Sequence, residues 1–271
     1  TSSKVKAWFT KRNIFKLYRK NFKNKAMSKT MRFKGWQMVY TGMMMEFSVV
    51  GFVFYCFPLM FSELERDLGA SQTQLSSALS LFFIFSTLAS IFLGRILDKY
   101  SIKGIMTLGG IIFSLGLFSI AMVENTLSLL LIYATLIAVG GPALGNLSIT
   151  KLVANWFDTK AGMALGIAAI GISFSGVVLP ILVDPLIDSI GWRNVYLVFG
   201  ASVVFILLPA VRILVINTPE EIGQKKDNLE TQLTSDADQK LLNVSDFFKS
   251  KIFWIISLTL AFILELVPEP V

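Results

Sequence analysis

Long apolar stretches make up most of this chain, and short polar segments separate them. The pattern predicts six complete helices and the start of a seventh, at residues 36–61, 74–97, 104–123, 127–151, 161–187, 192–216 and 251–267. At about 1.5 Å per residue, helices of this length cross a hydrocarbon core about 30 Å thick. Lipid cannot hydrogen-bond free backbone groups, so the spans must be helical. The predicted fold class is therefore an all-α membrane protein.

The composition supports this class and excludes some chemistry. Of 271 residues, 54% are hydrophobic and only 16% are charged, whereas soluble domains carry about 25% charged residues. The chain has no histidine, and its single cysteine, Cys56, lies inside an apolar stretch. Metal sites built from histidine and cysteine are therefore excluded, as are disulfides within the chain.

Positive charge is concentrated at the start of the chain. Residues 1–35 contain 12 Lys and Arg and no acidic residue, with aromatic residues interleaved. The segment fits an amphipathic helix on an anionic membrane, a nucleic-acid-binding arm, or a solvated leader that only sets topology. The leader is the simplest interpretation, so no nucleic-acid partner is expected.

The loops predict orientation and domain organisation. Positive loops alternate with neutral or acidic loops along the chain, which predicts a cytoplasmic N-terminus. Residues 217–250 are polar and of mixed charge, typical of a mobile connector. The expected parts are a basic cytoplasmic tail at 1–35, a six-helix bundle at 36–216, a cytoplasmic linker at 217–250 and a truncated seventh helix at 251–271.

A charged segment between the second and third spans carries the clearest motif. Residues 94–104 read GRILDKYSIKG. The segment resembles the signature loop of the major facilitator superfamily of transporters, usually Gly-x-Leu-Ala-Asp-Arg-x-Gly-Arg-Arg, although Ser101 replaces the second glycine. The resemblance implies a cytoplasmic gate in which Asp98 meets the N-terminal end of a helix in a second bundle. The implied gate residues are Gly94, Arg95, Asp98, Lys99 and Lys103. The alternative is a solvated aspartate in an ordinary positive loop.

A second motif opens the fifth span. Residues 155–176 read NWFDTKAGMALGIAAIGISFSG. With Gly35-Trp36 at the first span, this resembles the monocarboxylate-carrier and oxalate/formate-exchanger branch of the same superfamily. The resemblance covers about residues 35–216. Small residues at helical spacing also let helices approach closely, which alone is a sufficient explanation. The residues of this helix-packing motif are Phe157, Lys160, Gly162, Gly166, Gly171 and Ser175.

Polar residues inside the spans are candidates for a solute site. Glu46 lies about ten residues into the first span, where an ionised group costs a few kcal/mol or more. It is either a proton-coupling carboxyl or a neutral acid bonded to a neighbouring helix. Tyr55 and Asn146 are further cavity candidates. Lys151 is close enough to the surface to extend its ammonium into water.

The resemblance implies a function without catalysis or cofactors. The expectation is secondary active transport of a small organic anion, a monocarboxylate, by alternating access, driven by protons or a counter-anion. The partners are then the solute, the proton or counter-anion, the lipid bilayer and a missing C-terminal half. The chain is thus expected to be a fragment, a truncated and inactive half-transporter, or a half that dimerises. The alternative function is a non-transporting membrane scaffold or sensor.

Overall fold

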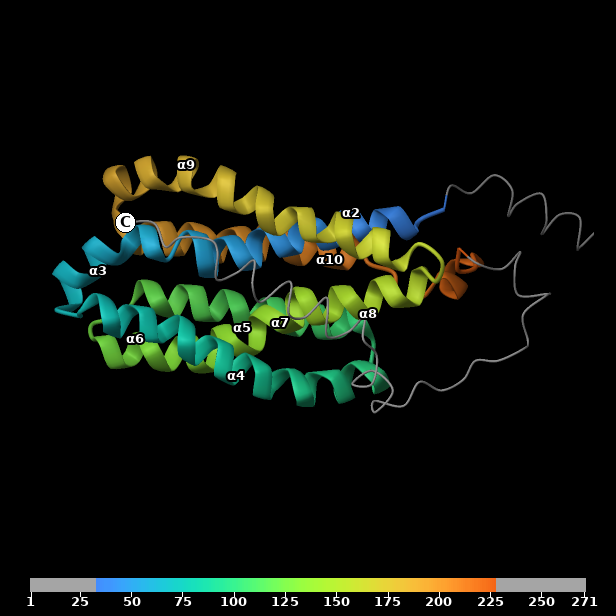
Figure 1. The fold of residues 1–271 in the computed structure, drawn as a ribbon, viewed down its shortest axis with the longest axis horizontal. Helices are drawn as coiled ribbons and strands as arrows, with labels where there is room; N and C mark the ends of the chain where they lie inside the picture. Colours follow the sequence, from blue (N-terminus) through green and yellow to red (C-terminus); the bar gives the residue numbers. More distant parts are fainter. Residues whose placement is uncertain (1–32, 228–271) are drawn as a thin grey trace, which may run out of the picture. The chain divides into compact units, whose positions relative to one another are not determined.

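A computed structural model describes residues 33–227, which fold entirely into helices and short connections (Figure 1). The predicted tail to residue 32, the linker from residue 228 and the seventh helix lie outside the described residues. The α-helices are α2 (Gly35–Val50), α3 (Phe61–Leu68), α4 (Gln72–Lys99), α5 (Ile102–Ala121), α6 (Thr126–Ile132), α7 (Ala138–Leu144), α8 (Asn146–Trp156), α9 (Ala161–Ser202) and α10 (Leu208–Leu214). The π-helical segments are η1 (Gly51–Tyr55), η3 (Tyr133–Ile137) and η4 (Val203–Leu207), and the 3₁₀ segments are η2 (Pro58–Met60) and η5 (Pro219–Ile222).

Within residues 33–227, five continuous helical runs are long and apolar enough to cross a membrane. The last, Ala161–Leu214, has 54 residues and contains a reversal at Gly191, where φ is 78° and ψ is 153°. Only glycine adopts this backbone conformation without strain. The run therefore makes two crossings that run in opposite directions (Figure 1). The total is six crossings, as the hydrophobic pattern predicts.

Three of the crossings contain a π-helical segment, and two of these also bend or break, which the hydrophobic pattern does not reveal; the sixth crossing passes through η4. The first changes from α2 to the π-helical η1, then bends through Cys56 and Phe57 before η2 and α3. The fourth passes through η3 and breaks at Gly145, between α7 and α8. A π-helical turn inside an α-helix shifts the register of its side chains and often marks a functional site.

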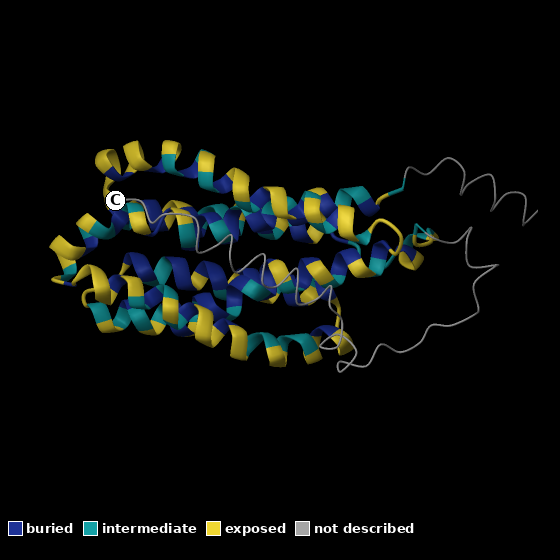
Figure 2. Cartoon of the chain, viewed as in Figure 1, coloured by how far each residue is buried: buried dark blue, intermediate teal, exposed yellow. Residues whose placement is uncertain are grey.

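The helices differ strongly in how much of their surface is buried (Figure 2). In the most apolar part of the first and third crossings, 56% of residues are buried. The corresponding fraction is 17% for α4 and 28% for the run that begins with α9. Exposed apolar residues of α4 include Ile84, Leu88, Ile91 and Phe92, and those of α9 include Ile170, Phe174, Val177 and Ile181. Much of the surface of α4 and α9 is therefore not covered by the other described helices.

One end of the bundle, here called the Asp67 end, carries a polar cluster. The indole N–H of Trp192 donates to Asp67 Oδ2 at 2.9 Å, and Arg193 Nη1 donates to the same oxygen at 2.5 Å. Arg193 Nη2 also donates to the carbonyl of Val123 at 3.1 Å, and its guanidinium lies 4.2 Å from the centre of the Trp192 ring. This cluster joins α3, the turn after α5 and the reversal at Gly191.

Candidate functional site: a carboxyl-lined cavity and a polar end

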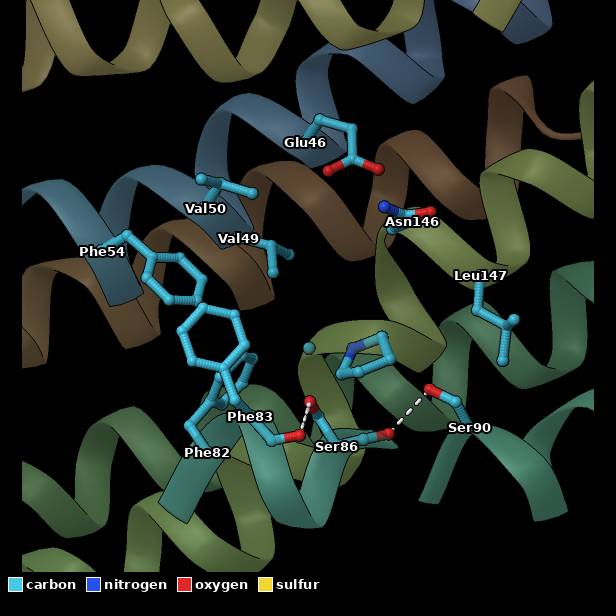
Figure 3. Close-up of a pocket in the computed structure, with 12 residues that line it drawn as sticks. Glu46, Val49, Val50, Phe54, Phe82, Phe83, Ser86, Ser90, Asn146 and Leu147 are labelled. Atoms are coloured by element: carbon cyan, nitrogen blue, oxygen red, sulfur yellow. Dashed lines mark hydrogen bonds between the residues drawn. The ribbon is translucent and has the colours of Figure 1, made fainter. Parts of the chain in front are cut away.

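A cavity of about 360 Å³ lies between the first, second and fourth crossings (Figure 3). This volume is within the usual range for small-molecule sites. Its lining residues are Glu46, Val49, Val50, Phe54, Phe82, Phe83, Ser86, Ser90, Gly141, Pro142, Asn146 and Leu147. The break at Gly145 begins α8 at Asn146 and so sets the position of this amide at the cavity.

Among the described residues, Glu46 is the only charged one that lines the cavity. The residue is 4% exposed, and its Oε2 atom has no hydrogen-bond partner among the described residues. A buried carboxylate without a donor or counter-charge carries a large desolvation cost. The second hypothesis for Glu46 was a neutral acid that is hydrogen-bonded to a neighbouring helix. No such hydrogen bond from Oε2 is present among the described residues. Glu46 has an oxygen ready for a proton, a cation or a donor group of a solute.

Two serines that sequence reasoning missed also line the cavity. Ser86 Oγ donates to the carbonyl of Phe83 at 3.2 Å, and Ser90 Oγ donates to the carbonyl of Ser86 at 2.7 Å (Figure 3). Their protons are thus used within α4, and their oxygens remain acceptors. The signal was available in the sequence, because the two serines are four residues apart and therefore share one face of the helix.

Asn146 is the amide at this site. Its Oδ1 atom accepts a hydrogen bond from Thr150 Oγ1 at 3.3 Å, one turn later in α8. No described residue accepts from its Nδ2 group, so this NH₂ group is available as a donor. The cavity therefore offers one amide donor beside acceptor oxygens and one carboxyl group.

Tyr55, the third cavity candidate, lies apart from Glu46 and Asn146. It is not among the lining residues, and its ring lies against Gly176 of α9. The reason is the π-helical turn η1, in which Tyr55 is the last residue and which shifts the side chains that follow Val50.

The opposite end of the bundle, here called the Asp98 end, holds the predicted gate residues. Asp98 Oδ1 lies 2.6 Å from Lys151 Nζ, with 66% and 39% of the respective side chains exposed. The ammonium of Lys151 therefore reaches the partly exposed Asp98 end, where it pairs with Asp98, a partner that the sequence pattern did not predict. No described residue forms an ion pair with Arg95 or Lys99. A Cβ on Gly94 would meet no described atom within 4 Å, so its surface is open within this bundle.

Residues 215–227 form a strap across the Asp98 end. Asn217 Oδ1 accepts from the backbone N–H of Lys103 at 2.9 Å and from Ser101 Oγ at 3.0 Å. The carbonyl of Ile216 accepts from the indole of Trp156 at 2.9 Å. The first part of the predicted mobile linker is therefore ordered against the bundle. Sequence reasoning missed this because each bond joins residues at least 60 positions apart.

Asp227 completes the strap at the start of α9. Its carboxylate accepts from the backbone N–H groups of Asp158, Thr159 and Lys160 at 2.6, 3.1 and 2.9 Å. Partial burial alone would raise the pKa of Asp227. The three N–H groups and the charge of Lys160 outweigh burial, so this pKa lies below its usual value. The contact resembles a helix N-cap supplied by a distant segment.

The predicted helix-packing motif divides into two parts. A Cβ on Gly171 would collide with the backbone oxygen of Met43, and Ser175 is fully buried, so this part packs α9 on α2. The ring of Phe157 lies 5.1 Å from that of Trp36. In contrast, a Cβ on Gly162 or Gly166 would meet no described atom within 4 Å. The predicted packing role of these two glycines is therefore not seen within residues 33–227, because they lie on the uncovered side of α9.

Membrane-length helices around a solute-sized cavity define an integral, multi-pass membrane protein. The model of the Major Facilitator Superfamily matches residues 43–267, and the chain belongs to this superfamily. Its members are transporters rather than enzymes.

Individual relatives are more distant. The chain is 27% identical over 191 residues to MFS-type transporter 1 of Ophiocordyceps sp., covering 69% of this chain and 42% of that protein. It is 23% identical over 194 residues to Monocarboxylate transporter 6 of Mus musculus, covering 72% of this chain and 41% of that protein. The chain thus spans less than half the length of these relatives.

A solved structure shares the fold. A bacterial homologue of the human lysosomal transporter Spinster, in an inward-facing and unoccupied conformation, aligns with a TM-score of 0.51. The sequence identity is 18%, and the alignment covers 73% of this chain and 45% of that one. The similarity supports the six-helix fold of one half of such a transporter.

Proposed function

We propose that this chain is the N-terminal half of a secondary active transporter that carries a small organic anion, a monocarboxylate, by alternating access. The observation that carries the proposal is the buried carboxyl of Glu46, a residue that lines a solute-sized cavity and whose Oε2 atom has no hydrogen-bond partner among the described residues. Similarity to a monocarboxylate transporter supports the solute class. The uncovered apolar surfaces of α4 and α9 support a second bundle packed against them.

Glu46 is proposed as the proton site. Its protonation removes the only negative charge lining the described part of the cavity, and so lowers the electrostatic cost of admitting an anion. Return of the empty carrier then requires the proton to leave. The solute and the proton therefore cross together. Alternatively, transport is driven by exchange of the solute against a counter-anion.

Asp98 is proposed as the gate at the cytoplasmic side. The Asp98 end carries Lys99, Lys103 and Lys151, which supports its assignment to the cytoplasm by the positive-inside rule. The exposed carboxylate of Asp98 is held by a single ion pair and can reach a helix end of the second bundle.

The test is uptake by the full-length gene product in proteoliposomes, with and without an inward proton gradient. We expect the gradient to stimulate uptake of a monocarboxylate, and Glu46→Gln to abolish this stimulation. The matched control is Glu124→Gln, at an exposed carboxylate in a loop. Unchanged stimulation in Glu46→Gln would rule out Glu46 as the proton site. Uptake that depends only on internal counter-anion would favour exchange.

A further inference from the structure

The cavity has an aromatic region that the proposed transport of simple carboxylates does not use. Phe54, Phe82 and Phe83 line it together (Figure 3). The ring of Phe54 lies 5.2 Å from each of the other two rings, and the rings of Phe82 and Phe83 are 5.8 Å apart. Such centroid distances are typical of attractive aromatic pairs. The three residues form one apolar wall, here called the aromatic wall.

The aromatic wall is separated from the polar groups along the axis of the bundle. Phe54 follows Glu46 by eight residues in the first crossing, and Ser90 follows Phe82 by eight residues in α4. At about 1.5 Å per residue, each separation is about 12 Å. The two crossings run in opposite directions, so both place their rings toward the Asp67 end and their polar groups toward the Asp98 end (Figures 1 and 3).

The wall has an edge that a solute can reach. Phe82 is 6% exposed, whereas Phe83 is 57% exposed, so Phe83 is the more accessible of these two rings within the described bundle. The residues between the polar and aromatic regions, Val49 and Val50, are also apolar. A solute that contacts Glu46 and extends along the first crossing therefore meets apolar side chains before it reaches Phe54, while Ser86 lines the α4 side of the same path.

We infer that this cavity takes an amphipathic carboxylate, with its carboxyl group at Glu46 and Asn146 and an aryl or bulky apolar body against the aromatic wall. The inference rests on the proposed function and narrows its substrate class. Formate and oxalate have no apolar body, so they leave the wall without a partner. Phe83 is the specificity-determining residue, because it is the exposed member of the wall.

A chain-length series tests the inference in proteoliposomes that contain the full-length gene product. The solutes are phenylacetate, 3-phenylpropionate and 4-phenylbutyrate, with butyrate and formate as partners that lack the ring. We expect kcat/KM to rise along the phenyl series and to be at least about tenfold higher for 4-phenylbutyrate than for butyrate. Equal values for the phenyl acids, butyrate and formate would overturn the inference and leave the proposed function standing. Absence of uptake for every carboxylate would overturn both.

The variant Phe83→Leu removes the ring and keeps an apolar side chain. We expect it to lower kcat/KM for 4-phenylbutyrate by about three- to tenfold, and to leave that for butyrate unchanged. The matched control is Phe85→Leu, two residues later in α4, which is 42% exposed and does not line this cavity. An equal loss for both solutes in Phe83→Leu, or an equal effect of Phe85→Leu, would reject the aromatic wall as a subsite.

Discussion

The two ends of the bundle hold an aspartate in different ways. At the Asp67 end, the carboxylate accepts from the indole of Trp192 and from Arg193, and Arg193 is itself bonded to a backbone carbonyl. At the Asp98 end, the carboxylate has one ion pair among residues 33–227, to Lys151, and 66% of its side chain is exposed.

This difference indicates that the contacts of Asp67 are structural, whereas the ion pair of Asp98 can be exchanged for another partner. The Asp67 cluster includes Trp192, which is 3% exposed, so its disruption disturbs packing as well as hydrogen bonds. A single exposed ion pair contributes little to stability and can be exchanged for another partner at little cost. At the Asp98 end, the hydrogen bonds that hold the helices together come instead from the strap. The following predictions, from the largest effect to the smallest, test this comparison.

The largest effect is expected at Trp192. Trp192→Ala removes a large buried ring and should lower the free energy of unfolding by about 3–5 kcal/mol. Trp192→Phe keeps a ring but loses the hydrogen bond to Asp67, so its cost should be about 1–3 kcal/mol. Thermal unfolding of the purified protein in detergent measures both. Phe205→Ala, at a residue that is 77% exposed, is the control. A neutral Trp192→Phe variant would show that the Asp67 cluster is not structural.

A smaller effect is expected at the strap. Asp227→Ala removes the acceptor for three backbone N–H groups and should cost about 0.5–2 kcal/mol, as for a lost helix cap. Asp227→Asn keeps one acceptor oxygen and should cost less. Glu220→Ala, at an exposed carboxylate of η5, is the control. A cost no greater than that of the control would show that the strap does not stabilise the Asp98 end.

The contribution of Asp227 should also depend on pH. Its folded-state pKa lies below the unfolded value near 3.8, so the stabilisation is fully present above that value. It is lost as the pH falls through the lower, folded-state pKa. The difference in melting temperature between the parent protein and Asp227→Ala should therefore be constant from neutral pH to about pH 5 and shrink below about pH 4. A difference that grows with acidity would contradict this sign.

The smallest effect on stability is expected for the pair of Asp98 and Lys151. A double-mutant cycle with Asp98→Asn and Lys151→Gln should give a coupling energy of about 0.2–1 kcal/mol, measured as above. The coupling should weaken in high salt, because both side chains are partly exposed. A coupling energy above about 2 kcal/mol would show that Asp98 is held by a strong, structural ion pair, and the two ends of the bundle would then not differ in how they hold an aspartate.

Much of the fold follows from local patterns, whereas much of the site does not. The six crossings, the reversal near Gly191 and the place of Glu46 inside the membrane are predicted from hydropathy and residue type. The partner of Asp98 was missed, because Lys151 lies 53 positions away and belongs to another crossing. The position of Tyr55 against Gly176 of α9 could not be read from the sequence either, because no residue pattern reveals the π-helical turn η1.

The amino-acid sequence alone establishes an all-helical membrane protein whose first span contains a carboxyl group. The physical reason is that backbone hydrogen bonding and transfer into lipid act on each segment separately. The tertiary structure decides that Oε2 of Glu46 has no described partner, that three phenylalanines from two crossings share one wall, and that the two aspartates differ in their restraint. These properties depend on how each helix is rotated against its neighbours, and that rotation results from contacts between residues far apart in the chain.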